Sequence, residues 1–339
     1  MIQNFCKNVS FGSKGYAYLY NTKKSNIVLI SGNNSNHRYL KDKIKKINNG
    51  KIIHFTLKNE RNSLEYIKKL SKKLNNINIS FLLVLGGGSI IDFSKRLFKK
   101  LNKSVKFVIF PSVIGSGAET SISSIINTKN NKNIIVNNKF LPDAVIYDEN
   151  LIKSCKETQI LMGLLDAVTH NIESILTFNA NPYLSFLSKY TIDYFIDNFS
   201  QILNKNKKLI NYKILSIISF NGGLAQSNAG SAICHALAHS AEIITKENHS
   251  KCISFFIIAT LNYYSIKNKY QLKKLNPKII FCIKKIVKRL ETKISFSKLK
   301  NILKNQRKFN ELLKIASKDP CWKLYEKNIN INLLKKCLI

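Results

Sequence analysis

The sequence contains few acidic residues. Its 19 Asp and Glu accompany 55 Lys and Arg, which leaves a formal charge of +36 at pH 7. Such an excess of cations is typical of nucleic-acid-binding proteins, but the lysines are spread over the whole chain and no recognisable nucleic-acid-binding module occurs. We therefore expect no nucleic acid as a partner. The charge instead favours anionic ligands, which include nucleotide cofactors and acidic sugars.

Disulfide patterns and long apolar runs are absent as well. The seven cysteines are scattered and never spaced as Cys-x-x-Cys, which argues against a disulfide framework or a Cys-ligated zinc site and for free thiols in a reducing compartment. The most apolar run, residues 253–260, is too short to span a membrane. Residues 1–15 lack the apolar stretch of a signal peptide. We expect a cytoplasmic protein that does not bind membranes.

Apolar runs and helical patterns alternate up to about residue 150. This β-α-β alternation predicts a parallel sheet covered by helices, with a hairpin over residues 121–138. Beyond residue 150, long apolar-periodic segments predict helices. We expect an α/β domain over residues 1–150 and an all-α domain over residues 151–339. The predicted strands are 26–31, 51–55, 81–85, 105–110 and 144–147, and the predicted helical segments are 63–74, 89–101, 161–203, 210–227, 231–245 and 264–308.

Two glycine-rich loops follow predicted strands. The run Gly86-Gly87-Gly88-Ser89 closes one strand and opens a helix, where glycines admit a phosphate and free N–H groups can bind it. The alternative is a tight turn with Ser89 as a helix cap. A second loop, residues 111–120, follows the next strand. Because the carboxyl ends of parallel strands share one edge of a sheet, both loops could flank one dinucleotide.

Four of the six histidines lie between residues 170 and 249. Asp166 and His170 are four residues apart, as are His235 and His239, so each pair can share one face of a helix. One carboxylate and two or three imidazoles can hold a divalent transition metal. Each histidine alone could be a surface or core residue, but two pairs at helical spacing favour a metal site.

Five motifs in a fixed order, followed by a further histidine, resemble the iron-containing (group III) alcohol dehydrogenase family over nearly the full chain. They are GGGSIID, PSVIGSGAE, PDAVIYD, GLLDAVTHNIES and SNAGSAICHALAH. The resemblance implies a dehydroquinate synthase-like fold, in which a Rossmann-like N-terminal domain and a helical C-terminal domain enclose a catalytic cleft. It also implies an NAD(P)-dependent oxidoreductase that acts on an alcohol or aldehyde, and a homodimer formed through the N-terminal edge strand.

The same resemblance implies the cofactors and the site residues. The cofactors are a divalent metal, Fe²⁺ or Zn²⁺, and NAD or NADP. The metal acts as a Lewis acid on the substrate oxygen, the nicotinamide accepts the hydride, and the catalytic residue His239 relays the proton. The implied metal ligands are Asp166, His170, His235 and His249, and the implied cofactor-binding residues are Gly86, Gly87, Gly88, Ser89, Asp92, Ser112 and Ser116.

Some positions depart from the family pattern. The second loop usually reads Pro-Thr-Thr-x-Gly-Thr-Gly-Ser-Glu, but here Ser112, Val113, Ser116 and Ala118 replace the Thr-Thr, Thr and Ser. The last ligand commonly sits in Pro-His-Gly, which is Asn248-His249-Ser250 here. No acidic residue follows the first predicted sheet strand, so NAD and NADP both remain open.

One branch of the family matches further stretches of the chain. GSGAETS, AVIYDENLI, TFNANPYLSFLSKY and a late Pro-Cys-Trp are similar to 3-deoxy-D-manno-octulosonate 8-oxidase, which oxidises the terminal primary alcohol of a sugar acid. Three further functions stay open. They are a reductase of a small aldehyde (an alkanal or phosphonoacetaldehyde), a lyase of the dehydroquinate synthase type, which carries Glu in place of Asp166, and a basic nonenzymatic nucleic-acid-binding protein.

Overall fold

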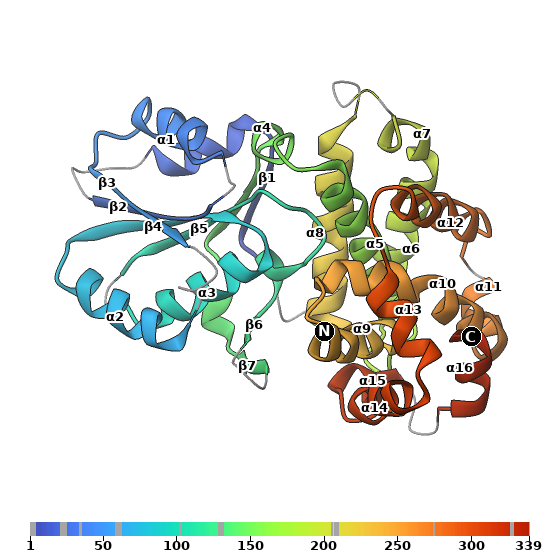
Figure 1. Ribbon diagram of the computed structural model, residues 1–339. Coiled ribbons are helices and arrows are strands. Elements are labelled where there is room, and N and C mark those ends of the chain that lie inside the picture. The colour runs from blue at the N-terminus through green and yellow to red at the C-terminus, as the bar shows by residue number, and fades with distance from the viewer. Residues whose placement is uncertain are drawn as a thin grey trace. The chain divides into compact units, whose positions relative to one another are not determined.

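The computed structural model describes residues 5–20, 26–33, 36–57, 63–101, 104–127, 132–204, 206, 210–273, 275–325 and 329–338. The chain divides into two compact units (Figure 1). The α/β unit comprises Ile2–Cys155 together with the short segment Leu215–Ile217. The helical unit comprises Lys156–Ile214 and Ile218–Ile339.

A six-stranded parallel sheet forms the centre of the α/β unit, in the order β1-β8-β5-β4-β2-β3. Its central strands are almost continuously apolar because helices cover both faces. The residues predicted to form a hairpin do form an antiparallel pair, β6 with β7. The strands are β1 (Asn8–Phe11), β2 (Asn26–Gly32), β3 (Ile52–Leu57), β4 (Ile79–Gly86), β5 (Lys106–Pro111), β6 (Ser123–Asn127), β7 (Lys132–Val136) and β8 (Ala144–Tyr147).

Helices lie on both faces of this sheet (Figure 1). Leu70 of α2 and Leu97 of α3 belong to one apolar cluster with Leu82 of β4. On the other face, Leu40 of α1 belongs to a cluster with Leu29 of β2. Two faces covered by helices define a doubly wound sheet. The helices of this unit are η1 (Ser13–Leu19), α1 (His37–Lys45), α2 (Leu64–Asn75), α3 (Gly88–Lys99), η3 (Ala118–Thr120), η4 (Asn138–Phe140) and α4 (Glu149–Ile152).

The helical unit packs around α5, most of whose side chains are buried. The helical segment predicted over residues 161–203 consists of more than one helix, because Asn181 caps a new helix at Leu184 N and Pro182 occupies its first turn. None of the described helices could cross a membrane. The helices are α5 (Glu157–Ser174), α6 (Pro182–Asp197), α7 (Phe199–Ile202), α8 (Tyr212–Ala229), α9 (Ile233–Thr245), α10 (His249–Lys267), α11 (Lys269–Lys273), α12 (Lys278–Glu291), α13 (Ser297–Lys304), α14 (Gln306–Ala316), α15 (Pro320–Tyr325) and α16 (Ile331–Leu338).

The predicted fold class is confirmed. A parallel sheet wound on both faces by helices is Rossmann-like, and the second unit contains helices and no strand among its described residues. The spacing of apolar residues was sufficient to predict this fold class, because buried strands and amphipathic helices have different apolar repeats.

The close packing at the end of β4 gives a testable difference between two glycines. A β-carbon on Gly86 would lie 2.6 Å from Cβ of Ile90, whereas one on Gly32 would lie 3.5 Å from Cγ1 of the same residue. We expect Gly86→Ala to lower the free energy of unfolding by about 1–3 kcal/mol through overpacking. The control, Gly32→Ala, should stay within about 0.5 kcal/mol of the wild type. Thermal melting of both variants tests this, and equal melting temperatures would contradict it.

Candidate functional site

Helix α5 places three polar side chains on one buried face. Asp166, His170 and Glu173 follow one another at intervals of four and three residues, which is the spacing of neighbours on a helix surface. All three are almost inaccessible to solvent. Because burying ionisable groups is costly unless they have partners, their surroundings should show what they bind.

The partners come from α9 and α10. His235 and His239 lie one turn apart on α9, and His249 is the first residue of α10. Lys246 adopts the left-handed conformation that ends α9, and the Asn248 side chain caps α10 by accepting a hydrogen bond from Ser250 N. This short connection brings His249 back beside the histidines of α9.

Three imidazole nitrogens surround one carboxylate oxygen. Oδ1 of Asp166 lies 3.7 Å from Nε2 of His170, 3.4 Å from Nε2 of His235 and 3.8 Å from Nε2 of His249. Tetrahedral bonds of about 2.0–2.2 Å to a metal would separate donor atoms by roughly 3.3–3.6 Å. Among the described residues, neither Asp166 Oδ1 nor His235 Nε2 has a hydrogen-bond partner. The donor atoms of Asp166, His170 and His235 all lie within 4.8 Å of one another and could hold one divalent metal. His249, the fourth predicted ligand, lies beside them through its 3.8 Å approach to Asp166.

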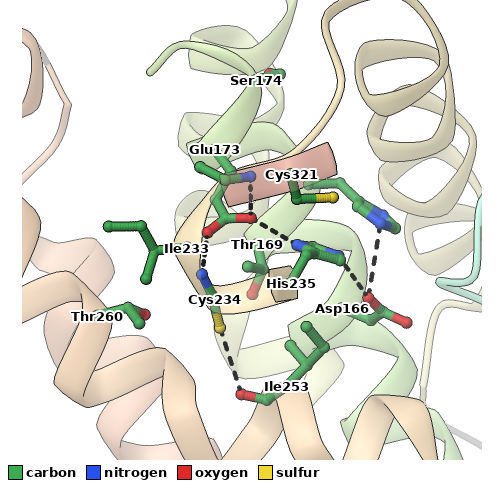
Figure 2. A network of polar contacts seen from close by, with 12 residues as sticks. Asp166, Thr169, Glu173, Ser174, Ile233, Cys234, His235, Ile253, Thr260 and Cys321 are labelled. Atoms are coloured by element: carbon green, nitrogen blue, oxygen red, sulfur yellow. Dashed lines mark hydrogen bonds and ion pairs between the residues drawn. The ribbon is translucent and has the colours of Figure 1, made fainter. Parts of the chain in front are cut away.

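Further side chains orient these donors. Glu173 Oε2 lies 2.6 Å from His235 Nδ1, so His235 stands between two carboxylates (Figure 2). The Ser250 hydroxyl donates a hydrogen bond of 2.9 Å to the second oxygen of Asp166. Glu242 lies 3.5 Å from Nδ1 of His249. Contacts of this kind fix which ring nitrogen faces a metal.

Burial and neighbouring charges set the protonation of the cluster. Burial, with the adjacent His235, lowers the pKa of His170 to about 3. Burial alone would raise the pKa of Asp166, but the His249 and His170 imidazoles hold it below its usual range. Burial alone would lower the pKa of His235, whereas its contacts with Asp166 and Glu173 raise it to about 9. An ionised Asp166 and a neutral His170 are the forms that bind metal ions.

His239, predicted to be catalytic, lies beside the cluster. Its ring stacks on that of His249 with centroids 5.0 Å apart, and its Nδ1 lies 2.9 Å from Oδ2 of Asp319. The other oxygen of Asp319 accepts a hydrogen bond from Cys321 N. Asp319 therefore holds the imidazole in one orientation, as carboxylates commonly do for histidines that move protons.

The two glycine-rich loops lie side by side at the carboxyl edge of the sheet, as predicted. Ser112 N donates a hydrogen bond of 3.1 Å to Gly86 O. A β-carbon on Gly88 would lie 3.3 Å from Cβ of Ser116. Gly87 and Gly88 open α3 and Ser89 is exposed in its first turn, so N–H groups at this helix end can meet a phosphate.

Asp92 has a different environment from the other predicted cofactor-binding residues. It is buried in α3, where its carboxylate accepts a hydrogen bond from Ile125 N and lies 3.7 Å from Lys95 Nζ. Lys95, itself fully buried, donates to Ser121 O and Ser123 O. The contacts of Asp92 thus tether the β6 segment to α3, and its role toward a cofactor stays a prediction.

Sequence reasoning missed three residues of the site. Glu173 had a signal, because it lies three residues after His170 and seven after Asp166 on the same helix face. Ser250 follows a predicted ligand directly. Asp319 lies 80 residues from His239 and carries no local signal, so only the tertiary structure reveals it.

Known proteins resemble this chain in sequence and in fold. The family model described as iron-containing alcohol dehydrogenase matches residues 8–149, and the C-terminal model of the Fe-containing alcohol dehydrogenase family matches residues 160–318. The alcohol dehydrogenase of Oenococcus oeni has a similar fold, with a TM-score of 0.84 at 15% identity over 100% of this chain and 99% of that one. An iron-containing alcohol dehydrogenase of Thermococcus thioreducens gives 0.82 at 18% identity over 100% and 98%.

Curated relatives match over shorter stretches. The probable alcohol dehydrogenase EutG of Escherichia coli is 27% identical over 134 residues, which are 39% of this chain and 34% of that protein. The 4-hydroxybutyrate dehydrogenase of Clostridium kluyveri is 26% identical over 145 residues, which are 40% and 38%. The chain thus spans little more than a third of the length of these relatives. The two family models together cover most of the sequence, and the chain belongs to the iron-containing alcohol dehydrogenase family.

Proposed function

We propose that the protein is a metal-dependent, NAD(P)-linked alcohol dehydrogenase. The observation that carries the proposal is the buried cluster in which one carboxylate oxygen of Asp166 faces three imidazole nitrogens at 3.4–3.8 Å. Family membership supports the same activity, because the family is named for iron-containing alcohol dehydrogenases. The support is strongest for the metal centre, whose donors all belong to the helical unit.

Asp166, His170, His235 and His249 would hold the metal. One carboxylate and three imidazoles suit Fe²⁺ or Zn²⁺, which both accept oxygen and nitrogen ligands. When bound, such a metal supplies Lewis acidity that lowers the pKa of a substrate hydroxyl. The protein's part is to orient these donors: Ser250 contacts Asp166, Glu173 contacts His235 and Glu242 contacts His249.

His239 would move the proton of the substrate hydroxyl. It lies next to His249, and 20% of its side chain is exposed, so it is accessible to solvent as His249 is, whereas Asp166, His170 and His235 are buried. Asp319 accepts from its Nδ1–H and thereby stabilises the imidazolium that forms when Nε2 takes up a proton. His239 is therefore the proposed general base in alcohol oxidation and the general acid in the reverse reaction.

The glycine-rich turn between β4 and α3 would bind the dinucleotide phosphates. Gly86 ends β4, Gly87 is the N-cap of α3, and Gly88 and Ser89 lie in the first turn of that helix. The loop with Ser112 and Ser116 lies against this turn. A nicotinamide bound here supplies the hydride acceptor. The proposal includes both NAD and NADP.

The proposed substrate is a hydroxy acid with a terminal primary alcohol, such as 3-deoxy-D-manno-octulosonate. The motif similarity to the 8-oxidase supports a sugar acid, and the charge of +36 favours an anion. The name of the C. kluyveri relative, 4-hydroxybutyrate dehydrogenase, also contains a hydroxy acid with a primary alcohol. Reduction of a small aldehyde is the second candidate, supported by relatives named as alcohol dehydrogenases.

A lyase and a nucleic-acid-binding protein receive less support as functions of this chain. Both family models describe an enzyme family, so they do not favour a nonenzymatic nucleic-acid-binding protein. They describe a dehydrogenase family and not a lyase, and Asp166 stands where the lyases carry Glu. A homodimer through the edge strand β1 stays a prediction.

Metal binding by the cluster can be tested directly. Loss of a residue that only orients a ligand costs about 10–100-fold in metal affinity, so removing the ligand oxygen itself should cost at least that much. We expect Asp166→Ala to lower the affinity for Zn²⁺ by about 100-fold or more, measured by chelator competition. His54→Ala, which removes a histidine of the α/β unit, serves as the control and should retain wild-type affinity. Equal affinity of the two variants would refute the metal centre.

Turnover tests the activity and the substrate class. The anaerobically metal-loaded protein, mixed with NAD or NADP and 3-deoxy-D-manno-octulosonate, should produce reduced nicotinamide, followed by its absorbance. Removal of the metal with a chelator should abolish the signal, and addition of Fe²⁺ or Zn²⁺ should restore it. Turnover of small aldehydes with reduced cofactor, but not of the sugar acid, would favour the second candidate. No turnover with any alcohol or aldehyde would contradict the proposed activity.

A further inference from the structure

Helix α9, which carries His235, begins without a capping side chain of its own. The residue at its N-cap position is Ala232, which has no side-chain acceptor. The first N–H groups of a helix have no partner within it, and a Ser, Thr, Asp or Asn usually accepts one of them. In a buried helix such as α9, these groups need an acceptor from elsewhere.

Glu173 of α5 supplies that acceptor. Its Oε2 accepts hydrogen bonds from Ala232 N at 2.7 Å and its Oε1 from Cys234 N at 2.6 Å. The Tyr264 hydroxyl also donates to Oε1. His235 Nδ1 makes the fourth contact, at 2.6 Å from Oε2 (Figure 2). One carboxylate thus caps a helix and contacts a predicted metal ligand of the same helix.

These contacts determine which atoms of Glu173 and His235 carry hydrogen. Both oxygens of Glu173 accept hydrogen bonds from backbone N–H groups, which can only donate, so the side chain acts as an acceptor at each oxygen, as a carboxylate does. A carboxylate is an acceptor only, and therefore His235 Nδ1 carries a hydrogen. Nε2 of His235, which points at Asp166, is then the atom that would give up its proton and offer a lone pair when a metal binds.

We propose that Glu173 is a positioning residue that selects the metal-binding tautomer of His235 while capping α9. This role rests on the proposed metal centre. It couples metal affinity to the packing of α5 against α9, because the same carboxylate holds the helix end and the imidazole. Glu173 and Asp166 also bring two negative charges to a buried region, which matches the charge of a divalent cation.

Glu173→Gln separates the tautomer from the cap. An amide has one acceptor oxygen and one donor nitrogen. The Tyr264 hydroxyl already accepts from Ile233 N and Cys234 N. Of the four groups that contact Glu173, the His235 imidazole is therefore the one left to accept from that nitrogen, and it does so by moving its hydrogen to Nε2. Nε2–H cannot bind a metal. The variant also removes one acceptor from the start of α9, so it is combined with Ala232→Ser, whose hydroxyl can accept from an N–H of the first turn, that of Cys234 or His235.

The experiment measures Zn²⁺ affinity by chelator competition and the melting temperature of the metal-free protein. The variants are Glu173→Gln, Ala232→Ser, their combination, and Tyr264→Phe. We expect Glu173→Gln to weaken zinc binding by about 10–100-fold and Ala232→Ser to restore its melting temperature but not its zinc affinity. Tyr264→Phe removes a donor to the same carboxylate but keeps the tautomer, so its zinc affinity should stay within about threefold of the wild type.

Two results would overturn the proposal. The first is that Glu173→Gln binds zinc with wild-type affinity. The first is also met if the combined variant regains both the zinc affinity and the melting temperature of the wild type. Either outcome would mean that Glu173 only caps α9. Failure of the wild-type protein to bind zinc at all would instead refute the metal centre, and this role with it. The two failures are distinguishable because the first requires a wild type that binds the metal.

Discussion

An ionised carboxylate that is buried away from solvent needs neighbouring groups that stabilise its charge. Asp166 places this constraint on the helices around it. Asp166 lies in the middle of the buried helix α5, and the compensating groups are three imidazoles from α5, α9 and α10. The tight turn between α9 and α10 is needed because His249 must approach the same oxygen. A metal ion at this point would satisfy donors that otherwise lack hydrogen-bond partners among the described residues.

Residues that contact the predicted ligands restrict the orientations of the ligand side chains. Ser250 holds the second oxygen of Asp166, and Glu173 holds the ring of His235. Asp319 performs the corresponding task for His239, which is not part of the buried donor set. A site held in this way loses little conformational entropy when a ligand binds, because its side chains are already ordered. The α/β unit provides a different kind of site, formed mainly by backbone N–H groups at the start of α3.

Family membership and geometry support different parts of the functional conclusion. The family models establish the class of protein, and the cluster around Asp166 supports a metal-dependent reaction within it. Neither selects the substrate, since one fold with one metal site serves many alcohols. The high positive charge and the similarity to an oxidase of a sugar acid favour an anionic substrate.

The sequence by itself determined the fold class and the position of the two glycine-rich loops, and it predicted the ligand residues Asp166, His170, His235 and His249, of which the first three form one buried group of close donor atoms. This was possible because strands, helices and i, i+4 pairs leave local periodic patterns, and because the motifs occur in a fixed order. Only the tertiary structure decided that Glu173 caps α9 and that Asp319 reaches His239. It likewise showed that Asp92 contacts β6. These contacts join residues 33 to 80 positions apart, and local patterns cannot report them because helix packing creates them.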